Sequence, residues 1–264
     1  QASSKPNIVL IYADDLGYKD VGYQSDGNYK TPVLDSLTKQ GMVFTDAYTN
    51  AANCQPARAC LLSGNYTPRH HVFAVHSTNR GPKQQMRLVP IPNRDGLVKK
   101  DQTIADLLKT AGYATGHFGK WHLNGMRGPG APILAGDIRS PGQFGFDQWL
   151  SVTNFFDRNP ILSRKGEFEE FRGDSSEIVI DEALKFIRRE ANQDKPFFTV
   201  VWFGTPHSPF VATKEDKTQF TDLDDASANH YGELVAMDRS IGTLRQGLRD
   251  LKIADDTLFW FCSD

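Results

Sequence analysis

The segment with the most obvious chemical potential is Cys54-Gln55-Pro56-Ala57-Arg58. Pro56 fits the first turn of a helix, which places Cys54 at or near the residue that caps the helix. The dipole and free N–H groups of a helix start favour an anion there, and Arg58 can share a face with Cys54. The spacing is compatible with a reactive thiolate, and equally with a small residue at a helix start followed by a surface arginine.

Carboxylates follow two apolar runs that predict buried strands. Asp14 and Asp15 come directly after residues 7–13, and Asp264 comes soon after residues 257–262. Ligands of open α/β sheets bind beyond the carboxyl ends of the strands, so neighbouring strands would bring these three carboxylates to one edge. Close carboxylates repel one another unless a cation lies between them, and oxygen ligands suit Ca²⁺ or Mg²⁺. The alternative is that Asp14 and Asp15 only form a turn or cap a helix.

Two further segments offer cations and proton donors. In Gly119-Lys120-Trp121-His122 an extended chain would project Lys120 and His122 to one side and Trp121 to the other. A fixed cation beside a proton donor suits an anionic oxygen and a leaving group. His207 follows the apolar run 196–203 in a turn with flanking prolines, which makes it another candidate donor. The alternative is a solvated lysine and histidines that only pack.

The other histidines are interpreted as structural. They are His70, His71, His76, His117 and His230. The first three lie soon after the Cys54 segment, so they could still line a pocket beside it. Of the remaining cysteines, Cys60 is expected inside a helix and Cys262 inside a buried strand.

Composition and charge limit the classes of protein that fit. The chain has 264 residues and a formal net charge of -2, so no global basic field draws it to nucleic acid or to an anionic membrane. No apolar run approaches the roughly 18 residues of a membrane span. No signal peptide precedes the first strand, and a chain that begins at Gln1 suggests the mature form of an exported protein. Three cysteines cannot all pair, which argues against a disulfide scaffold.

The hydrophobic pattern predicts the elements that must position these residues. Apolar runs predict strands at residues 7–13, 42–48, 113–118, 196–203 and 257–262. Helical periodicity and caps predict helices at residues 31–41, 56–62, 103–111, 175–191 and 230–251. Alternating helices and buried strands favour an α/β fold with a mainly parallel central sheet and helices on both faces. The stretches 78–100 and 123–143 are expected to be long functional loops.

Together these segments resemble the sulfatase family, within the alkaline-phosphatase-like superfamily, along nearly the whole chain. The most specific element is Cys54-x-Pro56-x-Arg58, which is similar to the signature that directs oxidation of the cysteine to formylglycine. It occurs in the family's order with three other motifs, Asp14-Asp15-x-Gly17, Gly119-Lys120-Trp121-His122 and Pro206-His207. The sequence departs from the family where Ala57, Ser63 and Asn65 replace the usual Ser, Thr and Arg or Lys.

The resemblance implies a metal site and a modified nucleophile. Asp14, Asp15 and Asp264 resemble ligands of a divalent cation, normally Ca²⁺ rather than Mg²⁺. Cys54 resembles the residue that a formylglycine-generating maturase converts, and one oxygen of the converted side chain also contacts the metal. In such enzymes one hydroxyl of the aldehyde hydrate attacks sulfur, and the other then loses its proton and expels sulfate. The metal lowers the pKa of the attacking hydroxyl.

The resemblance also implies how the sulfate group is held. Arg58 resembles the residue that holds the nucleophile, and Lys120, His122 and His207 resemble groups that bind sulfate and transfer protons. His207, in preference to His122, would protonate the leaving oxygen. The implied substrate is a sulfated small molecule or glycan, and the implied location is the periplasm, the exterior of the cell or the lysosome.

Other interpretations stay open. A phosphodiesterase or phosphonate hydrolase of the same superfamily, or a non-catalytic binder of sulfated glycans, would keep the same motifs. Because a domain rarely ends directly after a buried strand, we expect residues 1–264 to be the N-terminal portion of a sulfatase catalytic domain. Such a piece would lack the family's small C-terminal subdomain and second sulfate-binding lysine, and could be inert alone. Asn65-Tyr66-Thr67 also fits an N-glycosylation sequon.

Overall fold

The computed structural model describes residues 5–25, 27–79, 81–125, 128, 130–154 and 158–264. Its centre is a seven-stranded sheet with the strand order β5-β4-β3-β2-β6-β1-β7. The strands are β1 (Asn7–Ala13), β2 (Ala114–Lys120), β3 (Gln148–Val152), β4 (Ile161–Arg164), β5 (Glu167–Glu170), β6 (Phe197–Trp202) and β7 (Thr257–Ser263). The neighbouring strands β3, β2, β6, β1 and β7 pair in parallel. Strand β4 pairs antiparallel with β3 and with β5.

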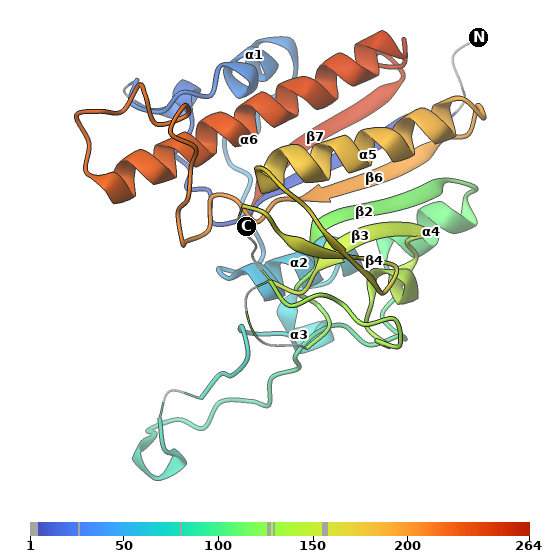
Figure 1. Cartoon of the computed structure of the whole chain (residues 1–264). Helices are drawn as coiled ribbons and strands as arrows, with labels where there is room; N and C mark the ends of the chain where they lie inside the picture. Colours follow the sequence, from blue (N-terminus) through green and yellow to red (C-terminus); the bar gives the residue numbers. More distant parts are fainter. Residues whose placement is uncertain (1–4, 26, 80, 126–127, 129, 155–157) are drawn as a thin grey trace.

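Helices lie on both sides of the sheet (Figure 1). One side carries α1 (Pro32–Gln40), α5 (Ser175–Ala191) and α6 (Asp225–Asp250), and the other carries α2 (Cys54–Ser63), α3 (Thr67–His70) and α4 (Ile104–Thr110). Three short 3-10 turns are η1 (Gly22–Gln24), η2 (Lys83–Gln85) and η3 (Pro141–Phe144). This arrangement confirms the expected α/β fold, because a parallel sheet must be covered on both faces.

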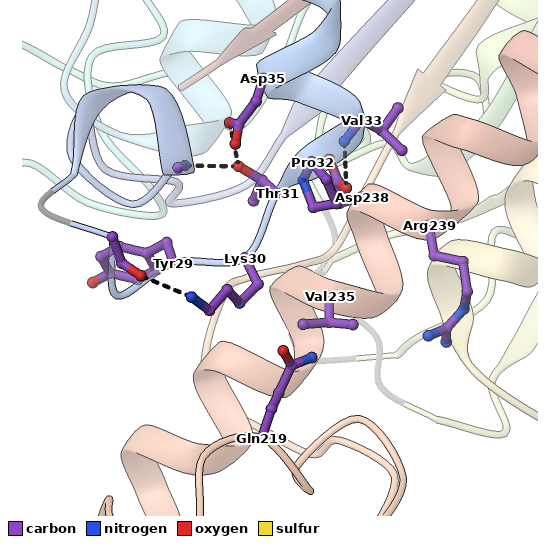
Figure 2. A pocket seen from close by; sticks show the side chains of 12 residues that line it. Tyr29, Lys30, Thr31, Pro32, Val33, Asp35, Gln219, Val235, Asp238 and Arg239 are labelled. Atoms are coloured by element: carbon purple, nitrogen blue, oxygen red, sulfur yellow. Dashed lines mark hydrogen bonds between the residues drawn. The ribbon is translucent and has the colours of Figure 1, made fainter.

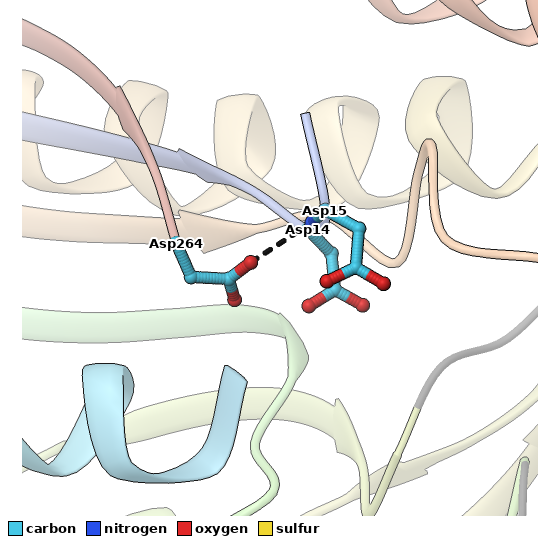
Figure 3. Close-up of side chains that lie close together, drawn as sticks. All are labelled: Asp14, Asp15 and Asp264. Carbon is cyan, nitrogen blue, oxygen red and sulfur yellow. Dashed lines mark hydrogen bonds between the residues drawn. The ribbon is translucent and has the colours of Figure 1, made fainter. Parts of the chain in front are cut away.

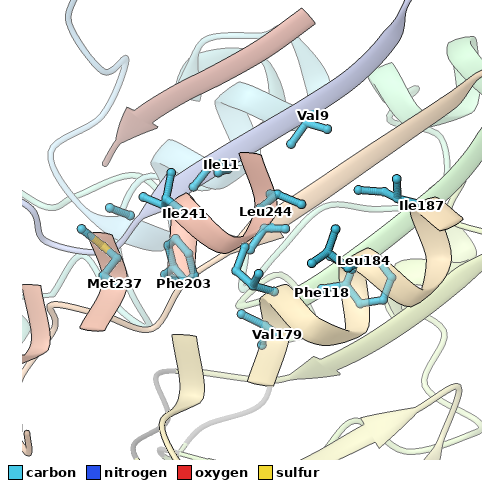
Figure 4. Packing of buried hydrophobic residues seen from close by; sticks show 14 of the residues in the cluster. Val9, Ile11, Phe118, Val179, Leu184, Ile187, Phe203, Met237, Ile241 and Leu244 are labelled. Atoms are coloured by element: carbon cyan, nitrogen blue, oxygen red, sulfur yellow. The ribbon is translucent and has the colours of Figure 1, made fainter. Parts of the chain in front are cut away.

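Each face of the sheet has its own apolar core. Side chains alternate between the two faces along a strand. Phe197 and Val201 of β6 therefore belong to the core formed with α5 and α6, part of which is drawn in Figure 4. Phe198, Val200 and Trp202 belong to the second core, with residues of α2 and α4. All six residues of β6 are buried, which explains why its sequence is a continuous apolar run rather than an alternating one.

One predicted strand, at residues 42–48, is wrong. The segment is irregular and exposed, with Met42 79% and Tyr48 83% accessible. A β-prone sequence forms a strand only where a sheet edge offers hydrogen-bond partners. Among the described residues this segment pairs with no strand, and its Phe44 instead lies against Trp260 of β7, with ring centroids 5.3 Å apart.

Other differences concern short strands and helix ends. The pattern gave no sign of β3, β4 and β5, because these strands are only four or five residues long and the β4–β5 hairpin is largely polar. The last helix begins at Asp225 rather than near residue 230, since the side chain of Asp224 accepts hydrogen bonds from two N–H groups of its first turn. Helix α2 includes Cys54, so Asn53 and not Cys54 is its capping residue.

The expectations about cysteines and membrane spans can also be compared with the structure. All three cysteines are free, Cys60 is buried within α2 as expected, and Cys262 is half-buried. In the part of the chain that the structure describes, no helix is long and apolar enough to cross a membrane.

Candidate active site

The carboxyl ends of neighbouring strands bring most of the predicted site residues to one sheet edge. In the parallel register Ala13 of β1 lies opposite Ser263 of β7, so Asp14 and Asp264 leave the sheet side by side. The N–H of Asp264 donates to the Ala13 carbonyl over 3.4 Å, and that of Asp14 donates to the Thr205 carbonyl over 3.0 Å. The turn that carries His207 is therefore tied to the same edge.

Three carboxylates meet at this edge (Figure 3). Asp14, Asp15 and Asp264 each offer a carboxylate oxygen within 4.8 Å of the others. The N–H of Asp15 donates to Oδ1 of Asp264 over 2.8 Å, and Asp15 adopts a left-handed φ of 59°. Asp14 is fully buried, whereas the side chain of Asp15 is 56% exposed. This edge brings together three carboxylates whose oxygens can act as metal ligands, and one of them is open to solvent. Such a set of ligands fits a hard divalent cation.

Two buried cations neutralise part of this charge. Nη2 of Arg58 lies 2.9 Å from Oδ1 of Asp14 and 3.2 Å from Oδ2 of Asp264, and Nζ of Lys120 lies 2.5 Å from Oδ2 of Asp14. Burial alone would raise the pKa of Asp14, but the charges of Lys120 and Arg58 outweigh it and hold that pKa well below its usual range. Burial raises the pKa of Asp264, against the opposing charge of Arg58.

Two aromatic rings make cation–π contacts with the guanidinium of Arg58. Its central carbon lies 5.1 Å from the ring centroid of Tyr12 and 4.9 Å from that of Trp202. These distances fit cation–π contacts, which help to stabilise a charge that is fully removed from water. The sequence gave no indication of either ring's role, because both lie in apolar strand runs that pattern analysis assigns to the core.

Cys54 lies in the first turn of α2, next to this charge cluster. The residue is 8% exposed, and the preceding Asn53 caps the helix in an extended conformation. Burial raises the pKa of the Cys54 thiol, Lys120 and Arg58 act in the opposite direction, and the net shift is upward. The geometry therefore argues against a resting thiolate, which the sequence had left open, even though the sulfur lies at a helix start.

Lys120 and His122 reach the site by different means. Strand β2 ends at Lys120, and the preceding Gly119 has a φ of 107°, where a Cβ atom would lie 2.0 Å from the carbonyl oxygen of Trp202. His122 has a φ of 58° and is no longer in a strand, so the expected strand alternation ends at Trp121. Burial and the charges of Lys120 and Arg58 lower the pKa of His122 to about 2, which keeps its imidazole neutral.

His207 lies at the exposed rim of the carboxylate cluster. Its Nε2 is 3.5 Å from Oδ2 of Asp15, and its Nδ1 lies 2.5 Å from the carbonyl oxygen of Ser208. A carbonyl can only accept, so Nδ1 carries a proton and Nε2 faces the carboxylate. The structure thus groups Asp14, Asp15, Asp264, Arg58, Cys54, Lys120, His122 and His207 around one sheet edge.

Most of the other histidines pack as expected. His117 is buried, with Nδ1 2.7 Å from Oγ of Ser151 and aromatic rings around it. His70 is buried with Nε2 3.3 Å from the sulfur of Cys60. His230 packs on Phe210, with ring centroids 4.7 Å apart.

A pocket in the described part of the chain lies away from this cluster. It has a volume of about 650 Å³, lies between α1 and α6, and contains none of the predicted site residues (Figure 2). The buried carboxylate of Asp238 on its wall accepts from the N–H groups of Val33 and Leu34, so it caps the start of α1. We therefore assign the chemistry to the carboxylate edge and not to this pocket.

Comparison with known proteins identifies the family of this chain. The family model described as Sulfatase matches residues 6–264, and the chain belongs to the sulfatase family. Human N-acetylgalactosamine-6-sulfatase is 31% identical over 280 residues, which cover 100% of this chain and 50% of that protein. The ulvan-active sulfatase of Formosa agariphila is 27% identical over 281 residues, which cover 99% of this chain and 50% of that protein.

A solved structure shows the same fold. The crystal structure of Ps i-CgsB matches with a TM-score of 0.82 at 28% identity, covering 98% of this chain and 58% of that one. The present chain spans about half the length of the curated relatives that it matches.

Proposed function

We propose that this chain is the N-terminal portion of the catalytic domain of a sulfuric ester hydrolase that acts on a sulfated carbohydrate. The observation that carries the proposal is the place of Cys54 at the start of α2, within the field of Asp14, Arg58 and Lys120. The family signature is thus found in a setting that can hold an anion and a cation together. The carbohydrate is supported by the relatives, which include an N-acetylgalactosamine-6-sulfatase and an ulvan-active sulfatase.

The side chains of the site have distinct roles in this proposal. Lys120, anchored on Asp14, places a fixed positive charge where the sulfate oxygens would lie. His122 is neutral, and neither of its ring nitrogens has a hydrogen-bond partner among the described residues, so it can donate to a sulfate oxygen. Arg58 holds Asp14 and Asp264 in place, and His207 protonates the leaving oxygen from the rim of the site.

The charge of the cluster favours a substrate with one negative charge. Asp14 and Asp264 are balanced by Arg58 and Lys120. A divalent cation beside Asp15 would then leave a single positive charge, which matches a sulfate ester or a phosphodiester. A phosphate monoester carries about -1.5 to -2 at neutral pH and fits this balance less well.

We propose Ca²⁺, with Mg²⁺ as the alternative, at Asp14, Asp15, Asp264 and the side chain at position 54. When bound, the cation supplies Lewis acidity and screens the charge of the sulfate group. A maturase would convert Cys54 to formylglycine, whose hydrate supplies the nucleophilic hydroxyl. An exported location (periplasmic, secreted or lysosomal) follows from the family resemblance.

Kinetics of the matured chain test the proposal. Protein produced together with a formylglycine-generating maturase, with conversion of Cys54 verified by peptide mass, should hydrolyse 4-nitrophenyl sulfate. A Cys54→Ala variant should lose at least about 1,000-fold in kcat/KM, because it cannot supply the nucleophile. Faster turnover of bis(4-nitrophenyl) phosphate than of the sulfate would favour a phosphodiesterase instead. Binding of sulfated glycans without turnover by the converted protein would favour a non-catalytic binder.

A further inference from the structure

His76 lies in a turn that is held firmly in an uncommon conformation. Its φ is 64°, in the left-handed region that residues other than glycine rarely adopt. The amide of Asn93 closes the turn, because its oxygen accepts from the N–H groups of Phe73 and Ala74 over 2.7 and 3.2 Å. The nitrogen of the same amide donates to the carbonyls of Ala74 and His76 over 2.9 and 3.2 Å. Backbone strain that is fixed so completely is typical of functional positions.

The chain after Asn93 joins this turn to the candidate active site. The carbonyl of Asp95 accepts from Nε2 of Gln55, the neighbour of Cys54, over 2.9 Å. Gly96 packs so closely on the backbone of Leu123, the neighbour of His122, that a Cβ atom would lie 2.0 Å from the Leu123 carbonyl oxygen. The segment that closes the His76 turn through Asn93 therefore goes on, two and three residues later, to contact the start of α2 and the segment that carries His122.

The imidazole of His76 is available for a ligand. It is half-buried, and it has no hydrogen bond, ion pair or ring contact with another residue in the described part of the chain. After burial, Lys120 and Arg58, an electrostatic interaction with His76 is also among the causes that lower the pKa of His122. This agrees with the contacts that join the segment closing the His76 turn to the backbone next to His122. An imidazole on a turn that is joined to the site, but outside the ion-pair cluster, can donate a hydrogen bond to the alcohol part of a substrate.

We propose that His76 contacts the sugar next to the sulfate ester and helps to determine which sulfated sugar the site accepts. This inference rests on the proposed sulfatase function and deepens it. Binding of the sulfate group itself is assigned to Lys120 and His122. The imidazole of His76, which lies outside that pair, would then donate to hydroxyl groups of the sugar. A site built to donate to a hydroxyl discriminates against ligands that lack it, because the donor then has no partner on the ligand.

His71 provides a matched control. It lies in the same loop, has a φ of 62°, and is exposed with its ring packed near Phe73, 5.9 Å between centroids. In both His71→Gly and His76→Gly the substitution removes an imidazole and a left-handed strain, so neither should lower Tm. His76→Asn is a second variant, since Asn tolerates this conformation. All are made in a Cys54→Ala background, which has no hydroxyl at position 54 to attack the sulfur of the ligand.

Calorimetric affinities distinguish the outcomes. The ligands are 4-nitrophenyl sulfate and whichever of N-acetylgalactosamine 6-sulfate, N-acetylglucosamine 6-sulfate and galactose 4-sulfate binds the background protein most tightly. His76→Gly and His76→Asn should weaken binding of the sugar sulfate at least about tenfold, and of the aryl sulfate less than about twofold, whereas His71→Gly should change neither.

Three results would overturn the inference. Unchanged affinity of the His76 variants for the sugar sulfate would remove the contact while leaving the sulfatase assignment intact. Equal weakening of both ligands would place His76 on the sulfate group instead, and a background protein that binds the aryl sulfate more tightly than every sugar would argue against a sugar-reading residue. Failure to bind any sulfate ester would contradict the proposed function itself.

Discussion

Arg58 illustrates how the candidate site stabilises charges away from water. Its side chain is fully buried, and removing a guanidinium from water costs several kcal/mol unless partners replace the solvent. Asp14, Asp264 and the faces of Tyr12 and Trp202 are those partners. Nη2 of Arg58 contacts both Asp14 and Asp264, and the carboxylate of Asp14 contacts both Arg58 and Lys120. The cluster therefore behaves as a unit whose members depend on one another.

Replacement of Arg58 tests that dependence. Arg58→Met keeps much of the volume but leaves two buried carboxylates with Lys120 alone, so the free energy of unfolding should fall by about 3–5 kcal/mol. Urea unfolding measures this change. Arg188→Met removes an exposed arginine of α5 and should stay within about 0.5 kcal/mol of the unsubstituted protein. Equally small changes in both variants would show that the cluster is not energetically coupled.

At the scale of elements, α1 is attached to α6 through one buried carboxylate. Each oxygen of Asp238 accepts a backbone N–H at the start of α1, from Val33 and Leu34, at 2.9 Å. Burial raises the pKa of Asp238 to about 6, although the two hydrogen bonds and Arg245 oppose the shift and Asp35 adds to it. Helix α1 is therefore attached by a group that titrates in a mildly acidic range.

This attachment should respond to pH in a defined direction. A folded pKa of about 6 lies above the usual 3.8, so the folded state binds this proton more tightly than the unfolded state. The contribution of Asp238 to stability is thus fully present below about pH 4 and is lost as pH rises through about 6, by about 3 kcal/mol at most. Asp238→Asn removes this titration, so its free energy of unfolding should fall less between pH 4 and 7. Parallel curves for the two proteins in urea unfolding would contradict the assignment.

At the scale of the whole molecule, the site exists only in the folded chain. Asp14, Arg58, Lys120 and Asp264 come from β1, α2, β2 and the residue after β7, and the sheet brings them together. A cation that binds this edge therefore binds the folded state and not the unfolded chain. Binding should then stabilise the whole fold by mass action.

Calcium should raise the melting temperature. At a free concentration of 100 times its Kd the ion contributes about 2.7 kcal/mol, which corresponds to about 5–10 °C in Tm for a chain of this size. Differential scanning fluorimetry with Ca²⁺, Mg²⁺ and EDTA measures the shift. Asp15→Asn should weaken the response. Asp255→Asn should leave it unchanged, because Asp255 is exposed and precedes β7, whereas Asp264 follows the other end of that strand. A Tm that neither ion moves would count against the metal assignment.

The sequence by itself determined the parts of the protein that depend on neighbouring residues. The apolar runs at residues 7–13 and 196–203 are β1 and β6, because a strand buried on both faces needs apolar side chains throughout. Helices α4 and α5 follow from their periodicity and from Thr103 and Asp174, which accept hydrogen bonds at the helix starts. The motifs also gave the candidates Asp14, Asp15, Cys54, Arg58, Lys120, His122 and His207, since motif positions are local.

The tertiary structure decided what depends on pairing between distant segments. The order of strands puts β7 beside β1 and so makes Asp264 a neighbour of Asp14, which no local pattern specifies. The same order leaves residues 42–48 without a described partner strand and therefore exposed, despite their β-prone sequence. The turn at His122, the rings around Arg58 and the contacts of Asp95 and Gly96 with the site segments arise likewise from packing. Side-chain environment is a property of long-range contacts, and these form only when the sheet does.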